Sequence, residues 1–82
     1  MAYNYYAELV RRIRYGGELQ KAEIRSDWPA FAPALVLTFR FGEERAIRHT
    51  MWDRFLKETY VRKAMEPEQY GWAVQLAQRA RM

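Results

Sequence analysis

The sequence of 82 residues contains no cysteine, one histidine and one serine. Without a thiol, the chain can form no disulfide and can use no cysteine as a nucleophile or metal ligand. A nucleophile, a base and an orienting group could come only from Ser26, His49 and a carboxylate, and no spacing indicates that they meet. We therefore expect a protein that is not an enzyme, with His49 at the margin of the hydrophobic core.

Long apolar runs and phosphate-binding glycine patterns are also missing. The longest nearly uncharged stretch, WPAFAPALVLTF, contains two prolines and is shorter than the ~20 residues of a membrane-spanning helix. The start, MAYNYYAELVRR, lacks the basic segment and apolar run of a signal peptide. The glycines match no nucleotide-binding motif, and one imidazole with scattered carboxylates makes no metal site. We expect a cytoplasmic protein without cofactor or metal.

The composition favours one folded domain that spans residues 1–82. Hydrophobic residues make up 50% of the chain and charged residues 29%, which is typical of a folded globular protein. No repeat, low-complexity tract or linker divides it. Fourteen basic and ten acidic residues give a net charge of +4. This charge permits an anionic partner without requiring one. The high share of arginine among the basic residues can reflect either a functional surface or the overall composition of the chain.

Apolar spacing predicts an α+β fold with the order α-β-β-β-α-α. A helix is expected from Tyr5, with Asn4 as its N-cap and Gly16-Gly17 as its end. Residues 18–25 and 34–41 alternate as strands, and a third strand follows the GEER turn. Helices are expected after Thr50 and from Pro67. The result is a small three-stranded antiparallel sheet with helices on one face.

The predicted hairpin places Leu35, Leu37, Phe39 and Phe41 on the inner face of the sheet. A loop of Gly42-Glu43-Glu44 sets Phe39 opposite Ile47. The other face is then expected to be open, polar and mildly basic, with Arg40 and Arg48 as diagonal neighbours.

The second helix is expected to begin with Thr50 as N-cap and with Asp53 three residues later, at the N3 position, in an arrangement similar to a capping box. Its apolar face would include Trp52, Phe55, Leu56 and Tyr60, while Val61 and Met65 would lie on the outer side. Pairs of opposite charge four residues apart, such as Arg54 with Glu58, would line its exposed face.

Three segments carry side chains suited to binding a partner. On the first helix an arginine and tyrosine patch lies opposite the apolar face, with a solvated helix surface as the alternative. In the loop DWPAFAP, Phe31 is expected to plug the core and Trp28 to be more exposed. On the last helix a tryptophan either covers the core or forms an interface with an arginine two turns later. The candidate residues are Arg11, Arg14, Tyr15, Trp28, Phe31, Trp72 and Arg79.

We expect a small binding protein that docks on a protein or nucleoprotein as an inhibitor, adaptor or regulator. Compact proteins of this size without catalytic groups are common among phage regulators, including inhibitors of host defence. One alternative is a nucleic-acid-binding module that contacts the RNA or DNA backbone through Arg11, Arg14, Arg40 and Arg48. A second is a homodimeric structural subunit that buries the same aromatic residues against its own copy.

Overall fold

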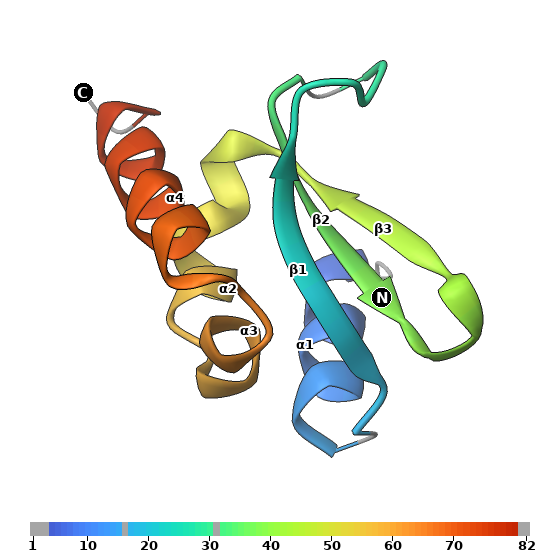
Figure 1. The fold of residues 1–82 in the computed structure, drawn as a ribbon. Helices are drawn as coiled ribbons and strands as arrows, with labels where there is room; N and C mark the ends of the chain where they lie inside the picture. The colour runs from blue at the N-terminus through green and yellow to red at the C-terminus, as the bar shows by residue number, and fades with distance from the viewer. Residues whose placement is uncertain (1–3, 16, 31, 81–82) are drawn as a thin grey trace.

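The computed structural model describes residues 4–15, 17–30 and 32–80. It consists of a three-stranded antiparallel sheet with the helices packed on one face (Figure 1). The strand order β1-β2-β3 confirms the predicted α+β meander. The elements are α1 (Tyr5–Tyr15), β1 (Leu19–Arg25), β2 (Ala34–Phe39), β3 (Glu44–Ile47), α2 (Trp52–Leu56), α3 (Thr59–Lys63) and α4 (Pro67–Ala80). This order has one helix more than the sequence predicts.

The two longest helices begin where the sequence predicts. The side-chain oxygen of Asn4 accepts the backbone N–H of Ala7 at 3.0 Å, which caps α1. After α1 the chain adopts a positive φ of +60° at Gly17, which only glycine adopts without cost. Pro67 is the first residue of α4, where its missing N–H leaves no hydrogen bond unmade.

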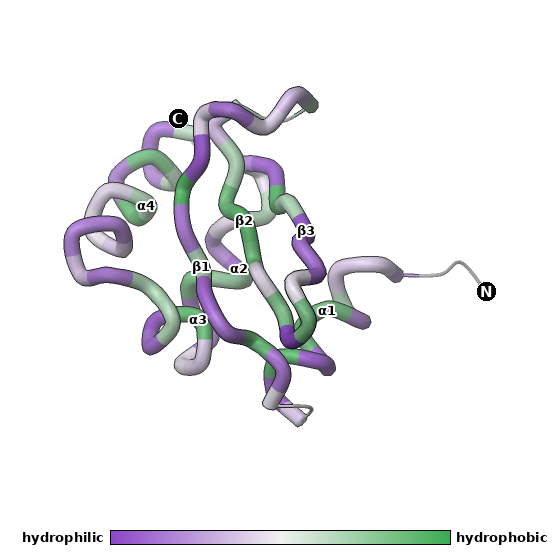
Figure 2. Tube along the Cα trace, turned by 45° about the vertical axis from the view of Figure 1, so that its right-hand side comes forward, coloured by the Kyte–Doolittle hydropathy of each residue, from purple (hydrophilic) through white to green (hydrophobic). Residues whose placement is uncertain are grey.

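One hydrophobic cluster joins the inner face of the sheet to all four helices. Alternate strand residues face it, because successive side chains of a strand point to opposite faces. Figure 2 shows the hydrophobic colour along β2, the central strand. The fully or almost fully buried members include Leu9, Ile13, Ile24, Leu35, Leu37, Phe39, Ile47, Trp52, Phe55, Val61 and Ala73.

The hairpin between β2 and β3 turns earlier than predicted. Leu35, rather than Phe39, lies opposite Ile47. The chain reverses at Arg40–Gly42, and the N–H of Phe39 donates to the carbonyl oxygen of Glu43 at 2.7 Å. The shift is an even number of residues, so the inner face keeps its side chains. It moves Phe41, however, from the predicted core into solvent.

The second predicted helix is divided into α2 and α3. Glu58 has extended backbone angles and separates them, with its carboxylate held by Arg14 rather than by Arg54. Thr50 lies in a short turn before α2 and caps nothing. The division changes the direction of the second half, so Val61 is buried and Tyr60 is 52% exposed. The predicted helix faces are therefore wrong after Leu56.

The two outer strands of the sheet differ in their surroundings. The N–H of Ala22 donates to the carbonyl oxygen of Ala64 at 3.1 Å, and the N–H of Ile24 to the side-chain oxygen of Gln69 at 2.6 Å. The end of α3 and the first turn of α4 thus cover the outer edge of β1 at Ala22 and Ile24. Within the described chain, β3 has a strand on one side alone.

The sequence predicted an open outer face of the sheet, but part of this face is covered. Ala34, Val36 and Ala46 are buried there, and half-buried Trp28 packs on them. The guanidinium of Arg25 lies 5.6 Å from the Trp28 ring centre and pairs with Asp27. Trp28 therefore covers a second, small apolar cluster and does not project freely into solvent. Phe31, its predicted counterpart, lies outside the described residues.

Candidate functional site

Three predicted residues of α1 come together around one surface hollow. Arg11, Arg14 and Tyr15 line it with Tyr6, Ala7 and Val10 of the same helix and Arg54 of α2. Its volume is about 290 Å³. The hollow combines an apolar base with three guanidinium groups.

The three arginines of this α1–α2 hollow differ in how fully they are paired. Arg14 donates from Nε and Nη2 to the two carboxylate oxygens of Glu58 at 2.9 and 2.7 Å, which raises the pKa of Arg14. Arg11 makes one longer contact of 3.5 Å with Glu8 and is well exposed. Arg54 is exposed and has no ion pair with any described residue. The hollow therefore retains cationic capacity at Arg11 and Arg54.

The tip of the β2–β3 hairpin carries Phe41, which the alternation of the strand predicts to lie in the core. Phe41 is 97% exposed and has a φ of +70°. A non-glycine residue in this region is uncommon, and for a bulky side chain it is strained. Gly42 beside it has a φ of +82°, which glycine adopts freely. Gly42 indicated the true position of the turn, since a left-handed glycine belongs inside a hairpin loop rather than at its start.

Arg12 fixes this tip against the rest of the molecule. Its guanidinium contacts the carboxylates of Glu18 at 3.1 Å and Glu43 at 2.6 Å, and lies 4.2 Å from the ring centre of Phe39. Arg12 lowers the pKa of Glu43 below its ordinary value, mainly through this hydrogen bond. The N–H of Arg40 also donates to the carbonyl oxygen of Glu18 at 2.8 Å. These contacts hold the turn that carries the exposed Phe41 ring.

The ion pairs of α1 do not follow the spacing of four residues. That spacing would allow Glu8 to pair with Arg12, but Glu8 contacts Arg11 instead. Both carboxylates held by Arg12 lie outside α1, in segments that only the tertiary fold brings close. The central role of Arg12 therefore left no local pattern in the sequence.

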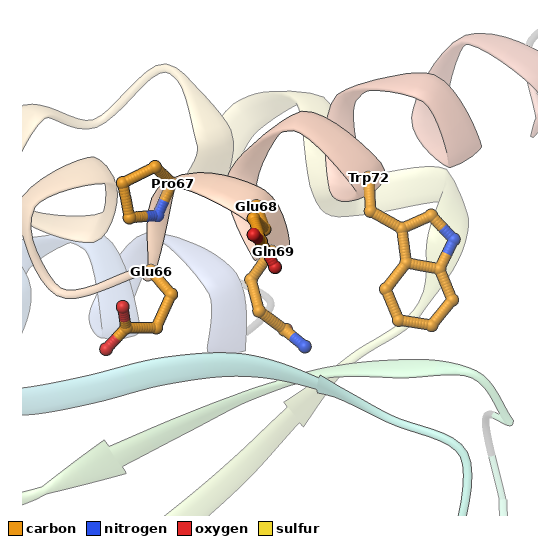
Figure 3. A pocket seen from close by; sticks show the side chains of 5 residues that line it. All are labelled: Glu66, Pro67, Glu68, Gln69 and Trp72. Carbon is orange, nitrogen blue, oxygen red and sulfur yellow. The ribbon is translucent and has the colours of Figure 1, made fainter.

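Trp72 lies beside a second hollow at the start of α4, apart from the α1 residues. Glu66, Pro67, Glu68 and Gln69 form this hollow with Trp72, and its volume is about 520 Å³. Figure 3 shows the side chains of Gln69 and Trp72 of α4, and of Glu66 just before it, extending toward the neighbouring strand. Trp72 is 46% exposed, so nearly half of its surface is open to solvent. Arg79 is exposed further along the same helix.

The residues of the nucleic-acid alternative do not form one basic surface. Arg40 lies in the hairpin turn, whereas Arg48 follows β3 at the other end of the hairpin. The predicted diagonal contact between them is wrong, because the turn comes earlier than expected. Arg14 is already held by Glu58.

The two residues considered for catalysis are also separated. Ser26 follows β1 and His49 follows β3, with β2 between these strands. His49 is half-buried, and its ring centre lies 4.6 Å from that of Trp52, which is consistent with a place at the core margin. Among the described residues, no histidine and carboxylate side chains gather as a metal-binding cluster. None of the helices in this part of the chain is both long and apolar enough to span a membrane.

Comparisons with protein-family models, curated proteins and solved structures found no match to this chain.

Proposed function

We propose that the chain is a small non-catalytic binding protein that docks on a protein partner, with Phe41 as its anchor. The observation that carries this proposal is an almost fully exposed phenylalanine with a left-handed backbone at a braced hairpin tip. The left-handed conformation costs roughly 1–2 kcal/mol for a residue with a side chain. In the free protein the exposed ring gains no free energy from burial. The ring can gain this free energy when a partner covers it.

The support under Phe41 suits this role. Arg12, Glu18 and Glu43 hold the turn before any partner arrives, so little conformational freedom remains to be lost on binding. Aromatic side chains are enriched at the centres of protein interfaces. Arg40, exposed next to Phe41, adds a cation at the edge of the contact. The tip therefore fits an apolar pocket with acidic residues at its rim.

We place this binding protein in the cytoplasm, as an inhibitor, adaptor or regulator of its partner, with a phage inhibitor of host defence as one such role. A protein partner is favoured over nucleic acid because the basic residues are dispersed. Arg40 and Arg48 lie far apart, and acidic side chains occupy Arg12, Arg14 and Arg25. A strong phosphate binder needs a contiguous basic surface.

Replacement of Phe41 by glycine separates binding from folding. Phe41→Gly relieves the left-handed strain, so the free energy of unfolding is expected to stay constant or rise by up to about 1 kcal/mol. Partner captured from an extract of the native cells is expected to fall at least about tenfold, as for an interface hot spot. Urea denaturation measures the first quantity and quantitative pull-down the second.

Tyr60→Ser is the matched control, because Tyr60 is an exposed aromatic on α3, away from the hairpin. It should capture the partner as well as wild type. Capture that survives Phe41→Gly in a folded protein would contradict the anchor role.

A homodimer is the second candidate, and one observation favours it. The tip presents Arg40 and Phe41, while the hollow at α4 presents Glu66, Glu68 and Trp72, so the two surfaces complement each other in charge and in aromatic character. Such a contact between copies should appear as a dimer in sedimentation equilibrium at tens of micromolar protein, and Arg40→Glu should remove it. A monomer throughout this range would exclude a stable dimer.

A further inference from the structure

We infer that the α1–α2 hollow binds an acidic peptide segment of the partner that also carries an apolar side chain. This assignment rests on the proposed function and names the chemistry of a second contact beyond the hairpin tip. The hollow is lined by Tyr6, Val10 and Tyr15 as its aromatic and apolar part, and by Arg11, Arg14 and Arg54 as its cationic part.

The apolar part of the hollow is fixed before binding. Tyr6 is half-buried, and its ring packs edge-on against the buried ring of Phe55, with 5.9 Å between ring centres. Val10 is half-buried beside it and belongs to the margin of the core. A volume of about 290 Å³ lies at the lower limit of small-molecule pockets. The space therefore suits one side chain of a peptide better than a whole cofactor.

The cationic part selects a negative ligand. Arg54 has no ion pair with a described residue, and Arg11 has only its contact of 3.5 Å with exposed Glu8. The exposed ring of Tyr15, 81% accessible, lies on the same rim. Arginine can bind a carboxylate through two parallel hydrogen bonds, which gives both affinity and orientation. Aspartate or glutamate residues on each side of one apolar residue match this arrangement.

A phosphate group fits the same hollow less well. Arg14 uses Nε and Nη2 on Glu58, and Glu8 contacts Arg11, so part of the positive charge of the hollow is already neutralised. A ligand that binds through negative charge alone therefore gains less than one that also fills the apolar part. The carbon atoms of the apolar base cannot donate hydrogen bonds to a phosphate. These features favour a peptide over a nucleic-acid backbone.

A direct titration with synthetic probes tests the assignment. The full-length protein is labelled with ¹⁵N and titrated with a capped peptide of sequence DELDE, and with DEGDE and KKLKK as matched peptides. Saturable shifts are expected at the amides of Val10, Tyr15 and Arg54 with DELDE. Binding of DEGDE should be weaker by at least about tenfold, and KKLKK should not bind. Inorganic phosphate and a short oligothymidylate should shift these amides only at much higher concentration.

Charge reversal at the rim locates the contact. Arg54→Glu should weaken DELDE binding by at least about tenfold. Lys63→Glu makes the same change in net charge on the exposed surface of α3, outside the hollow, and should leave binding nearly unchanged. Equal loss in both variants would show a general charge effect and overturn the assignment. Equal binding of DELDE and DEGDE, absence of saturable shifts, or preference for the oligonucleotide would also overturn it.

The outcome can be told apart from that of the proposed function. If Phe41→Gly loses the partner while DELDE fails to bind, the anchor stands and the hollow is excluded. If DELDE binds but partner capture does not depend on Phe41, the hollow stands and the anchor is excluded.

Discussion

Trp52→Ala is expected to lower the free energy of unfolding by about 3–5 kcal/mol, the usual loss for removal of a buried large aromatic side chain. Trp52 is fully buried between the sheet and the helices. Its indole N–H donates to the carbonyl oxygen of Ile47 at 2.6 Å, which ties the start of α2 to the end of β3. Alanine would leave both a cavity and an unpaired carbonyl oxygen.

This loss is large for a domain of this size, because small domains have total stabilities of roughly 5–15 kcal/mol. Urea denaturation followed by circular dichroism measures it. Trp72→Ala is the control, since the Trp72 side chain is nearly half exposed and should cost about 1 kcal/mol or less. Equal effects of the two substitutions would contradict the central place of Trp52 in the core.

Arg12→Gln is expected to lower the free energy of unfolding by about 2 kcal/mol. Hydrogen bonds to charged groups contribute roughly 1.5–3 kcal/mol, and partial exposure of the Arg12 side chain reduces this value. Glutamine removes the charge that holds Glu18 and Glu43 and the guanidinium that lies on the Phe39 ring. It should also loosen the hairpin tip and thereby weaken partner capture.

The pH dependence gives a second readout for Arg12. Arg12 lowers the pKa of Glu43 in the folded protein, so this pair stabilises the fold above the ordinary carboxyl pKa of 4.5. The contribution is lost as the pH falls through the lowered pKa. Wild type should therefore lose stability on acidification more steeply than Arg12→Gln between neutral pH and this acidic range. Denaturation midpoints at a series of pH values test the difference.

Arg11→Gln controls for the loss of one positive charge on the same helix. Arg11 is mostly exposed and makes one contact of 3.5 Å, so little change in stability is expected. Parallel pH profiles for wild type and Arg12→Gln would contradict the role of Arg12 as the support of the tip.

The parts of the fold that depend on local patterns could be predicted from the sequence. Asn4 marks a helix start by a local hydrogen bond and Pro67 by its missing N–H, and the alternation from Leu35 to Phe39 marks the central strand. The hairpin register depended on the turn, where a strained phenylalanine stands in a position usually given to glycine, asparagine or aspartate. At the break between α2 and α3, the carboxylate of Glu58 is held by Arg14, which is distant in sequence and gives no local signal.

The candidate site could be predicted only in part, for the same reason. Arg11, Arg14 and Tyr15 share a helix, so helical spacing alone placed them near each other. Arg54 joins them through the packing of α2 on the sheet and α1, which no local pattern indicates. Trp28 was expected to be more exposed than Phe31 because it lies beside Asp27 and farther from the apolar strand, but the small side chains of Ala34 and Ala46 leave space for its ring.

The covered outer edge of β1 limits how the protein can associate through its sheet. Ala64 and Gln69 accept the backbone N–H groups of Ala22 and Ile24, two donors that a further strand would need on that side. Among the described strands, the edge left for strand addition is that of β3, which is short and carries Glu44 and Arg45. Two copies joined through β3 would expose two β1 edges, and a further strand could pair there only by displacing Ala64 and Gln69. The native fold therefore resists templated fibril elongation, because a cross-β stack needs both edges of every layer.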